Sequence, residues 1–241
     1  MNIIVCESYE QMCEAAAIAV AAQVMVKPNT VLGLPTGKTP LGIYEEIVRI
    51  HRAGFIDFAL VRTFNLDEYA GVGKGDSGSY YEFMWENLFS KINIPKENAN
   101  IMNGKAEDLE AECDAYEDAI ELAGGIDLQL LGIGRNGHIG FNEPSDCFEP
   151  SAHVIQLDVG TLEANVSDFG SMDKMPKSAL TMGIGTIMGA RRIVLCASGA
   201  SKVRAVTDMA YGKVTPKNPA SILQFHHDVT VITDMEAGAE L

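Results

Sequence analysis

The sequence predicts an α/β protein with one parallel sheet and helices on both of its faces. Short apolar or β-branched runs alternate along the chain with segments of helical periodicity, which is the pattern of repeated βαβ units. The length of 241 residues and the hydrophobic content of 47% allow one large core, and α/β folds often reach this size undivided. We therefore expect a single domain over residues 1–241.

The expected elements begin with a short strand and a long helix. Ser8 and Gln11 form a capping-box pattern at the start of that helix, and Pro28 and Asn29 separate it from the next strand. The periodicity predicts strands near 2–5, 30–34, 60–64, 126–131, 191–196 and 228–233, and helices near 8–26, 40–53, 79–90, 108–122 and 200–211. The stretch 149–177 is the least regular, and we expect it to run over the mouth of the sheet.

Charge and cysteine content limit the classes of partner. The chain has 18 Lys and Arg against 33 Asp and Glu, a formal net charge of −15. Nucleic acids and anionic membranes bind basic faces, so we expect neither as a partner, whereas an anionic small molecule needs only a few local cations. The five cysteines are odd in number and lack metal-ligand spacing, which indicates reduced thiols. With no signal-peptide pattern and no apolar run of bilayer length, the sequence predicts a cytoplasmic protein.

The segment DLQLLGIGRNGHIGFNEP, residues 127–144, carries the strongest chemical pattern. An apolar run breaks into a turn that presents Asn136, His138 and Glu143 together. A strand that delivers a histidine and a carboxylate onto a loop at its end is typical of a catalytic site, although a histidine satisfied within a turn fits the same residues. Four glycines let this backbone pass close to a ligand, namely Gly132, Gly134, Gly137 and Gly140.

A second loop follows the strand predicted at 30–34. Thr36, Gly37, Lys38 and Thr39 precede a helix, and the free N–H groups at a helix start attract phosphate. An ordinary N-capped helix start explains the same residues about as well. The spacing is not that of a Walker A loop, and the glycines of the 127–144 segment do not form a convincing dinucleotide fingerprint.

Two further loops add carboxylates and a cation. Asp67 and Glu68 follow the third predicted strand, with Tyr80 after a glycine-rich segment, and Lys202 lies in a turn of small residues after the strand at 191–196. Such groups are often solvated bystanders. In a parallel sheet, however, ligands bind outside the carboxyl ends of the strands, where all four loops are expected to meet. The combination favours acid–base chemistry on a phosphorylated small molecule, with no metal or other cofactor.

The chain also resembles the glucosamine-6-phosphate deaminase family in motifs spread over nearly its whole length. The matching segments are LGLPTGKTPLGIYE (32–45), FNLDEY (64–69), SYYEFM (79–84), LLGIGRNGHIGFNEP (130–144), ALTMGIGTIM (179–188) and PASILQFH (219–226). The resemblance implies a single α/β domain with a Rossmann-like parallel sheet. It further implies conversion of glucosamine 6-phosphate and water to fructose 6-phosphate and ammonia. This reaction is an aldose–ketose isomerisation coupled to loss of the amine, with no cofactor.

The resemblance also implies roles for individual residues. Asp67 would move a proton between C2 and C1 of the open-chain sugar, and His138, oriented by Glu143, would open the pyranose ring. Asn136 would complete this histidine–carboxylate group. The residues expected to bind or support the substrate are Thr36, Gly37, Lys38, Thr39, Glu68, Tyr80, Gly137 and Lys202.

This sequence departs from the family pattern at several positions. Many members carry Asp where this chain has Asn136, and the pattern A-N-x-R places an arginine where this chain has Ser167. A serine cannot replace the bidentate fork of an arginine. Basic residues are also missing after the N-E-P motif, where this chain has EPSAH from Glu149 to His153. We therefore expect no activation by an acetylated sugar phosphate, and a monomer or small homo-oligomer.

Three alternatives stay open at this point. A galactosamine-6-phosphate isomerase or deaminase would use the same proton chemistry. A 6-phosphogluconolactonase shares the architecture and a glycine–histidine loop, but it needs no base at Asp67. A non-catalytic sugar-phosphate sensor would fit the loops, but it would not need both Asp67 and His138.

Overall fold

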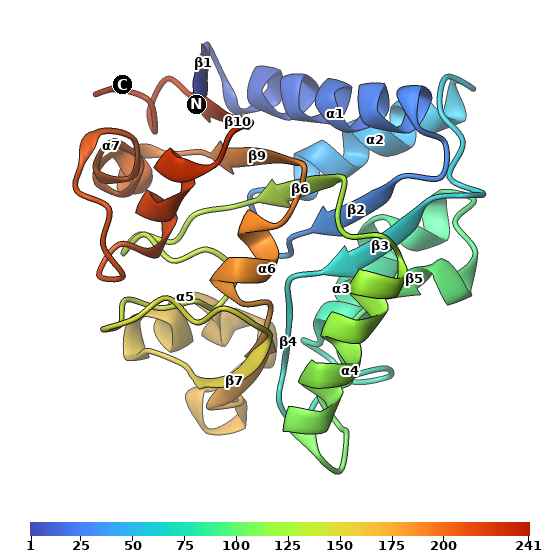
Figure 1. Ribbon diagram of the computed structural model, residues 1–241, viewed down its shortest axis with the longest axis vertical. Coiled ribbons are helices and arrows are strands. Elements are labelled where there is room, and N and C mark those ends of the chain that lie inside the picture. The colour runs from blue at the N-terminus through green and yellow to red at the C-terminus, as the bar shows by residue number, and fades with distance from the viewer.

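A parallel sheet forms the centre of the molecule in the computed structural model (Figure 1). The structure describes the backbone of residues 1–241 and all side chains except those of Val159, Ala164, Asn165, Ser167 and Asp168. Within the described chain, seven parallel strands pair in the order β1-β10-β9-β6-β2-β3-β5. Their bounds are β1 (Asn2–Cys6), β2 (Val31–Leu34), β3 (Arg62–Asn65), β5 (Ala99–Asn100), β6 (Leu128–Leu131), β9 (Arg192–Ala197) and β10 (Val229–Asp234).

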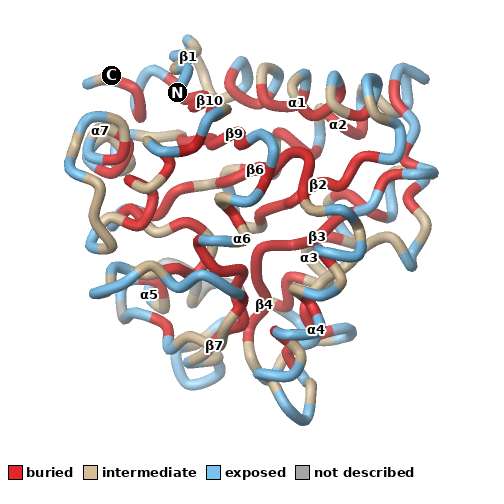
Figure 2. Tube along the Cα trace, in the orientation of Figure 1, coloured by how far each residue is buried: buried red, intermediate tan, exposed pale blue. Residues whose placement is uncertain are grey.

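Helices cover both faces of this sheet. The longer ones are α1 (Tyr9–Val26), α2 (Leu41–Arg52), α3 (Tyr80–Asn87), α4 (Leu109–Leu122) and α7 (Val203–Tyr211), and α6 (Ile184–Met188) is a short one. Buried side chains of α1, α2 and α3 pack on one face, and those of α4, α6 and α7 pack on the other. Consecutive strand residues point to opposite faces, so Val31 and Leu32 enter different cores. The central strands are buried on both sides, as Figure 2 shows.

A smaller antiparallel sheet lies beyond the carboxyl ends of the parallel strands. It has the order β4-β8-β7 and consists of β4 (Asp67–Tyr69), β8 (Ser178–Thr181) and β7 (His153–Gln156). The helix α5 (Val159–Phe169) follows β7 and lies beside this sheet in Figure 1. An aromatic cluster fills the space between them, since Tyr69 contacts both Phe141 and Phe169 with ring centroids 5.3 and 5.1 Å apart. The antiparallel layer therefore brings distant segments to the mouth of the main sheet.

The structure confirms the predicted α/β fold and corrects one part of the prediction. Each of the predicted strands and helices is present within a few residues, and Ser8 caps α1 by accepting a hydrogen bond from the Gln11 N–H at 3.3 Å. The expectation that 149–177 is irregular was wrong, because this stretch contains β7, α5 and a 3₁₀ turn. Strands β4, β5, β7 and β8 were not predicted, since these short strands contain polar residues and are not continuous apolar runs as β2 is.

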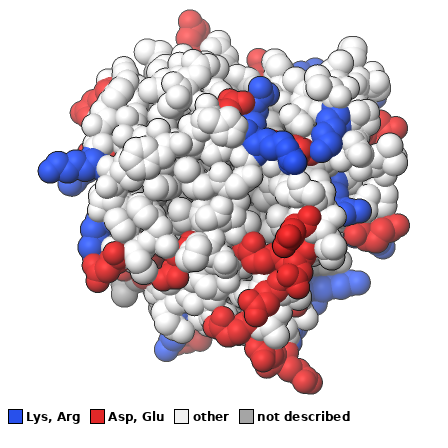
Figure 3. Space-filling view, in the orientation of Figure 1, with Lys and Arg blue, Asp and Glu red and all other residues white. Residues whose placement is uncertain are grey.

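The surface carries its acidic excess unevenly. Figure 3 shows Asp and Glu side chains gathered over the region of α4, with Lys and Arg above it. Glu110, Asp114, Asp118 and Glu121 are exposed on this helix, so its outer surface repels anionic partners. None of the helices in the described chain is long and apolar enough to span a membrane.

A buried carboxylate ties three strands together at the opposite edge of the sheet. Asp127, 3% exposed, accepts hydrogen bonds from the Lys27 ammonium at 2.8 Å and the Arg191 guanidinium at 3.1 Å. The Thr30 hydroxyl and the Val31 N–H also donate to it, at 3.1 and 2.8 Å. Burial raises the pKa of this carboxyl group, but the hydrogen bonds and charge of Lys27 and its neighbours outweigh burial, so the pKa lies below its ordinary value.

We expect Asp127→Asn to lower the free energy of unfolding by about 2 kcal/mol at pH 7, the scale of hydrogen bonds to a charged group. Because the pKa is depressed in the folded state, this contribution is present above the ordinary value of 3.8 and is lost as pH falls through the lower folded value. Urea unfolding at pH 7 and below pH 3 measures both. The control is Asp228→Asn, which removes an exposed pair with Arg192 and should change stability by less than about 0.5 kcal/mol. Equal effects of the two variants would contradict the assignment.

Candidate active site

Four loops meet at the carboxyl edge of the central sheet. Strands β9, β6, β2 and β3 are neighbours in the sheet order, so the loops that follow them are neighbours in space. The chain reverses its direction of sheet growth between β2 and β6, and ligands of open α/β sheets bind at such a switch point. The predicted residues after these strands therefore gather at one edge of the sheet.

Asp67 is a buried carboxylate without a compensating cation. It is 6% exposed, and no hydrogen bond or ion pair to its side chain exists among the residues whose side chains are described. Burial, and then the neighbouring charge of Glu68, raises the pKa of Asp67 to about 8. A carboxylate in this setting is suited to accept a proton near neutral pH. The alternative of a solvated surface acid is excluded by its burial.

The side chain of the neighbouring Glu68 is engaged in hydrogen bonds to the backbone. Its side chain is fully buried and accepts backbone N–H groups of Tyr69, Tyr80 and Tyr81, each at 2.9 Å. Burial raises the pKa of Glu68 to about 7 against the effect of these three donors. Two of the donors are the first N–H groups of α3, so Glu68 fastens the start of that helix to β4. Glu68 thus positions Asp67 and Tyr80 relative to each other.

The loop after β6 brings the predicted histidine group together. The Glu143 Oε2 atom lies 3.3 Å from His138 Nδ1 and accepts a hydrogen bond from the Asn136 amide at 2.7 Å. Asn136 also accepts the His138 backbone N–H at 3.2 Å. Burial raises the pKa of Glu143, but the hydrogen bond and charge of His138, with the other donors, lower it below its ordinary value. The amide of Asn136 therefore holds the carboxylate by donation, as an aspartate in its place would not do.

Two glycines allow this loop to approach its neighbours. A Cβ atom at Gly134 would lie 2.4 Å from the His138 ring, so only glycine leaves room for the imidazole. Gly140 has φ +57°, and a Cβ there would lie 2.9 Å from the Thr181 hydroxyl and 3.6 Å from Asp67 Oδ2. The Asp67 carboxylate therefore faces the backbone of the histidine loop.

The loop after β2 leads into α2 and contains a glycine of positive φ. Gly37 has φ +92°, and α2 begins after Pro40 without a side-chain cap. No side chain of this loop caps the helix, and the Gly42 N–H donates instead to the Tyr9 hydroxyl of α1 at 3.0 Å. Thr36 lies within hydrogen-bonding reach of the Tyr80 hydroxyl, which also contacts the Tyr69 hydroxyl at 3.2 Å. Lys38 is exposed and Thr39 is half-buried.

Lys202 reaches the histidine loop from the loop after β9. Its ammonium donates to the Ile133 carbonyl at 2.6 Å, directly before the histidine loop. Burial, and then the charge of Arg135, lowers the pKa of Lys202 to about 8. The turn that carries it is held by Asp234, which accepts from the Ser198 hydroxyl at 2.6 Å. Lys202 is thus a half-buried cation beside the histidine loop and not a solvated lysine.

The sequence did not indicate two side chains that lie near the candidate site residues. The Thr161 hydroxyl of α5 donates to Glu143 Oε1, and Arg135 lies close enough to affect Lys202. The spacing of Leu162, Val166 and Phe169 is helical and could have indicated α5. No local signal pairs Thr161 with a residue 18 positions earlier. The Ser167 side chain, predicted to leave an arginine position empty, lies outside the described residues.

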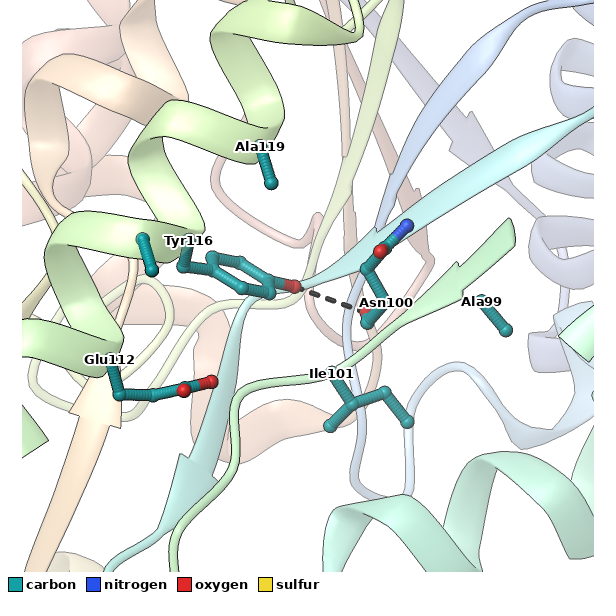
Figure 4. Close-up of a pocket in the computed structure, with 7 residues that line it drawn as sticks. Ala99, Asn100, Ile101, Glu112, Tyr116 and Ala119 are labelled. Carbon is teal, nitrogen blue, oxygen red and sulfur yellow. Dashed lines mark hydrogen bonds between the residues drawn. The ribbon is translucent and has the colours of Figure 1, made fainter. Parts of the chain in front are cut away.

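A separate hollow between β5 and α4 does not contain any of these residues (Figure 4). It is lined by Asn100, Glu112, Tyr116 and small side chains, and the Tyr116 hydroxyl lies 3.1 Å from the Asn100 carbonyl. Its polar groups are engaged within the fold, because Glu112 accepts the Asn103 N–H at 2.8 Å. The ionisable groups instead converge at the loops that follow β9, β6, β2 and β3, so this edge of the sheet is the candidate active site.

Comparison with known proteins agrees with this arrangement. A family model described as glucosamine-6-phosphate isomerases/6-phosphogluconolactonase matches residues 7–232. This chain belongs to that family. A member from Thermoanaerobacter sp. (strain X514), named glucosamine-6-phosphate deaminase, is 52% identical over 239 residues, which cover 99% of this chain and 94% of the relative. One from Clostridium botulinum (strain Kyoto / Type A2) with the same name is 51% identical over 241 residues, covering 100% and 99%.

Solved structures extend the comparison. A protein described as a monomeric glucosamine-6-phosphate deaminase superposes with a TM-score of 0.97 at 45% identity, covering 99% of each chain. A 6-phosphogluconolactonase from Leishmania guyanensis has a TM-score of 0.80 at 21% identity, covering 100% of this chain and 98% of its own. The second likeness concerns the fold alone. Together these findings confirm the family and the α/β architecture expected from the motifs.

Proposed function

We propose that this protein is a glucosamine-6-phosphate deaminase, converting glucosamine 6-phosphate and water to fructose 6-phosphate and ammonia. The observation that carries the proposal is the pairing of a buried, uncompensated Asp67 with a His138–Glu143 group across Gly140. A lactone hydrolase needs no base in the position of Asp67, and relatives at about half identity over the whole chain are named deaminases. The proposal therefore rests on chemistry and family together.

Ring opening is the first step we assign. His138 would transfer a proton at the ring oxygen of the pyranose, and Glu143 would keep the imidazole oriented and its charge compensated. The Asn136 amide supports the carboxylate from the other side. The half-buried histidine thus has a fixed partner on Nδ1, which leaves Nε2 for the substrate.

Proton transfer between carbons is the second step. Asp67 would remove the proton from C2 of the open-chain sugar and return it at C1, which forms and then consumes an enolamine. Water adds at C2 and ammonia leaves, so the ketose forms without any change in overall oxidation state. These steps need only proton transfer, and we propose that no cofactor takes part.

The phosphate is assigned to the loop Thr36–Thr39 and to Lys202. The backbone of residues 37–39 before α2, with the positive φ of Gly37, suits an anion, although the Gly42 N–H in the first turn of α2 already donates to the Tyr9 hydroxyl at 3.0 Å. Lys202 approaches from the opposite side of the β2–β6 switch point. Gly137, at φ +86°, lies in the histidine loop, which comes between the Thr36–Thr39 loop and Lys202 in the sequence. The substrate's phosphate would thereby hold the sugar carbons over Asp67.

We expect Lys202→Gln to raise the Michaelis constant. The expected loss of substrate-binding free energy is about 1.5–3 kcal/mol, the cost of losing a hydrogen bond to a charged group. Lys38→Gln should have a smaller effect, because Lys38 is exposed and its charge is screened by solvent. The control is Lys91→Gln in the turn after α3, which should leave the constant unchanged. Steady-state kinetics with glucosamine 6-phosphate measures all three. An unchanged constant in Lys202→Gln would remove this residue from the phosphate site.

The function is tested by ammonia release from glucosamine 6-phosphate and galactosamine 6-phosphate in parallel, with the ketose product assayed separately. We expect ammonia and fructose 6-phosphate from the first substrate, with faster turnover than for the second. Preference for the galactosamine epimer would reassign the substrate, and release of neither product would contradict the proposed reaction.

We further propose a monomer or small homo-oligomer in the cytoplasm. The relative at 45% identity is described as monomeric, and the five cysteines are free thiols, as expected in a reducing compartment. Light scattering coupled to size exclusion tests the assembly, and a hexamer would contradict it. Fractionation of cells of the source organism tests the location.

A further inference from the structure

Glu143 uses its two carboxylate oxygens for different partners. Oε2 faces the imidazole Nδ1 of His138 and the amide of Asn136. Oε1 accepts a hydrogen bond from the Thr161 hydroxyl, and the carboxylate side chain is only 9% exposed. A carboxylate can rotate about its last bond, so a donor fixed on one oxygen holds the carboxylate plane at the angle at which the other oxygen faces the histidine.

Thr161 is well held for this purpose. It is 5% exposed and lies in the first turn of α5, whose N-cap is Asp158. The helix itself is anchored independently of Glu143, because Leu162, Val166 and Phe169 pack against the aromatic cluster around Tyr69. The position of the hydroxyl is thus set by packing and not by the hydrogen bond itself.

We propose that Thr161 is a positioning residue for the reaction: its hydroxyl holds the Glu143 carboxylate in the rotation that presents Oε2 to His138. This inference rests on the proposed function, because it concerns the same histidine. It adds a residue on α5, outside the loop that carries the reacting groups, and makes the placement of α5 a condition for ring opening.

The charged surroundings determine how the loss of this hydroxyl would appear. His138 is the titratable group that contacts Glu143, and the other contacts among the described residues are the uncharged Asn136 and Thr161 groups. Asp67 lies across Gly140, and Arg135 precedes Asn136 in the same loop. On α5 and its cap, Glu163 and Asp158 are exposed. Removal of the donor would raise the pKa of Glu143, since a buried carboxylate would lose one of the hydrogen bonds that favour its charged form.

The test compares Thr161→Val with Thr161→Ser in ammonia release from glucosamine 6-phosphate. Valine keeps the branched shape without the hydroxyl, and we expect kcat to fall about tenfold, the effect of one lost hydrogen bond. Asp67 sets the limb near pH 8, and Glu143, whose pKa is lowered, sets a second loss of kcat at more acidic pH. This second acid limb should move to higher pH in Thr161→Val, because Glu143 must be ionised. Serine restores the hydroxyl and should return both quantities to within about twofold of the wild type.

Controls separate this inference from folding and from the proposed function. Glu163→Gln on the exposed side of α5 should leave kcat and the pH profile unchanged, and thermal unfolding reports whether each variant is folded. If Thr161→Val does not fold, Thr161→Ala serves with the same expected outcomes. If the wild type is active and the hydroxyl-free variant has the same kcat and the same second acid limb, the inference about Thr161 is wrong and the proposed function stands. No ammonia release by the wild type overturns the proposed function.

Discussion

Replacing Asp67 with Asn is expected to lower kcat by a factor on the order of 10²–10⁴ while leaving substrate binding close to that of the wild type. The amide keeps the size and polarity of the side chain but cannot accept the C2 proton. No hydrogen bond to the Asp67 side chain exists in the described part of the molecule, so the substitution breaks no contact there. Steady-state kinetics and direct binding of an unreactive substrate analogue measure the two effects separately.

The pH dependence follows from the burial of the same residue. Because burial raises the pKa of Asp67 to about 8, the ligand-free enzyme holds this carboxyl group largely protonated below that pH. A base must be ionised, so kcat/KM should rise with pH towards a limb near 8. The folded state binds the Asp67 proton more tightly than the unfolded chain, so stability falls as pH rises from the ordinary value of 3.8 to about 8. Asp67→Asn lacks this loss and should gain stability over the wild type across that range.

A matched control for both measurements is Asp208→Asn on the exposed side of α7, where Asp208 pairs with Arg204. It should leave kcat and the pH dependence of stability unchanged. Substantial turnover in Asp67→Asn, or a kcat/KM limb near the ordinary Asp value, would show that another group serves as the base.

The main sheet was predictable because its strands are signalled locally. Buried parallel strands such as β2 and β6 are continuous apolar runs, and the long helices have clear periodicity. The antiparallel layer was not, because β4 pairs with β8 through residues more than a hundred positions apart. Strands of three or four residues carry too little pattern to reveal such a partner. What the sequence lacked was the long-range pairing and not the local propensity.

The helix α5 was missed for a different reason. Its apolar residues Leu162, Val166 and Phe169 have helical spacing, Asp158 is an N-cap and Gly170 ends the helix at φ 78°. The local pattern was therefore present but was outweighed by the surrounding Gly, Ser and Asp residues. As a consequence, the contact of Thr161 with Glu143 was also missed.

The candidate site was largely predictable because one topological rule applies to it. Loops after neighbouring parallel strands converge, which explains why Asp67, His138 and Lys202 share an edge of the sheet. Burial could not be predicted in this way. The sequence left open whether Asp67 and Glu68 are solvated, and the structure buries them as part of β4 in the antiparallel layer, which was itself not foreseen.

His138→Gln separates ring opening from the later proton transfer. The imidazole Nδ1 lies 3.3 Å from Glu143 Oε2, and the ring packs where a Cβ at Gly134 would lie, so the position of the imidazole is fixed. With the pyranose form of glucosamine 6-phosphate, we expect kcat/KM to fall by a factor on the order of 10²–10⁴, because proton transfer at the ring oxygen is lost. Glutamine keeps hydrogen-bonding groups in the site but does not titrate near neutral pH.

A 4,5-dideoxy analogue of the substrate lacks the hydroxyl groups that close a pyranose or a furanose ring, so its reaction begins at the open-chain stage. We expect His138→Gln to release ammonia from this analogue at a rate within about tenfold of the wild type, since Asp67 is unchanged and ring opening is bypassed. The control is His227→Gln at an exposed position, which should behave as the wild type with both substrates. Asp67→Asn provides the opposite pattern, because the base is needed whether or not a ring must open. If His138→Gln loses activity equally on the pyranose and on the analogue, the histidine acts at the carbon-to-carbon proton transfer, and its assignment to ring opening is wrong.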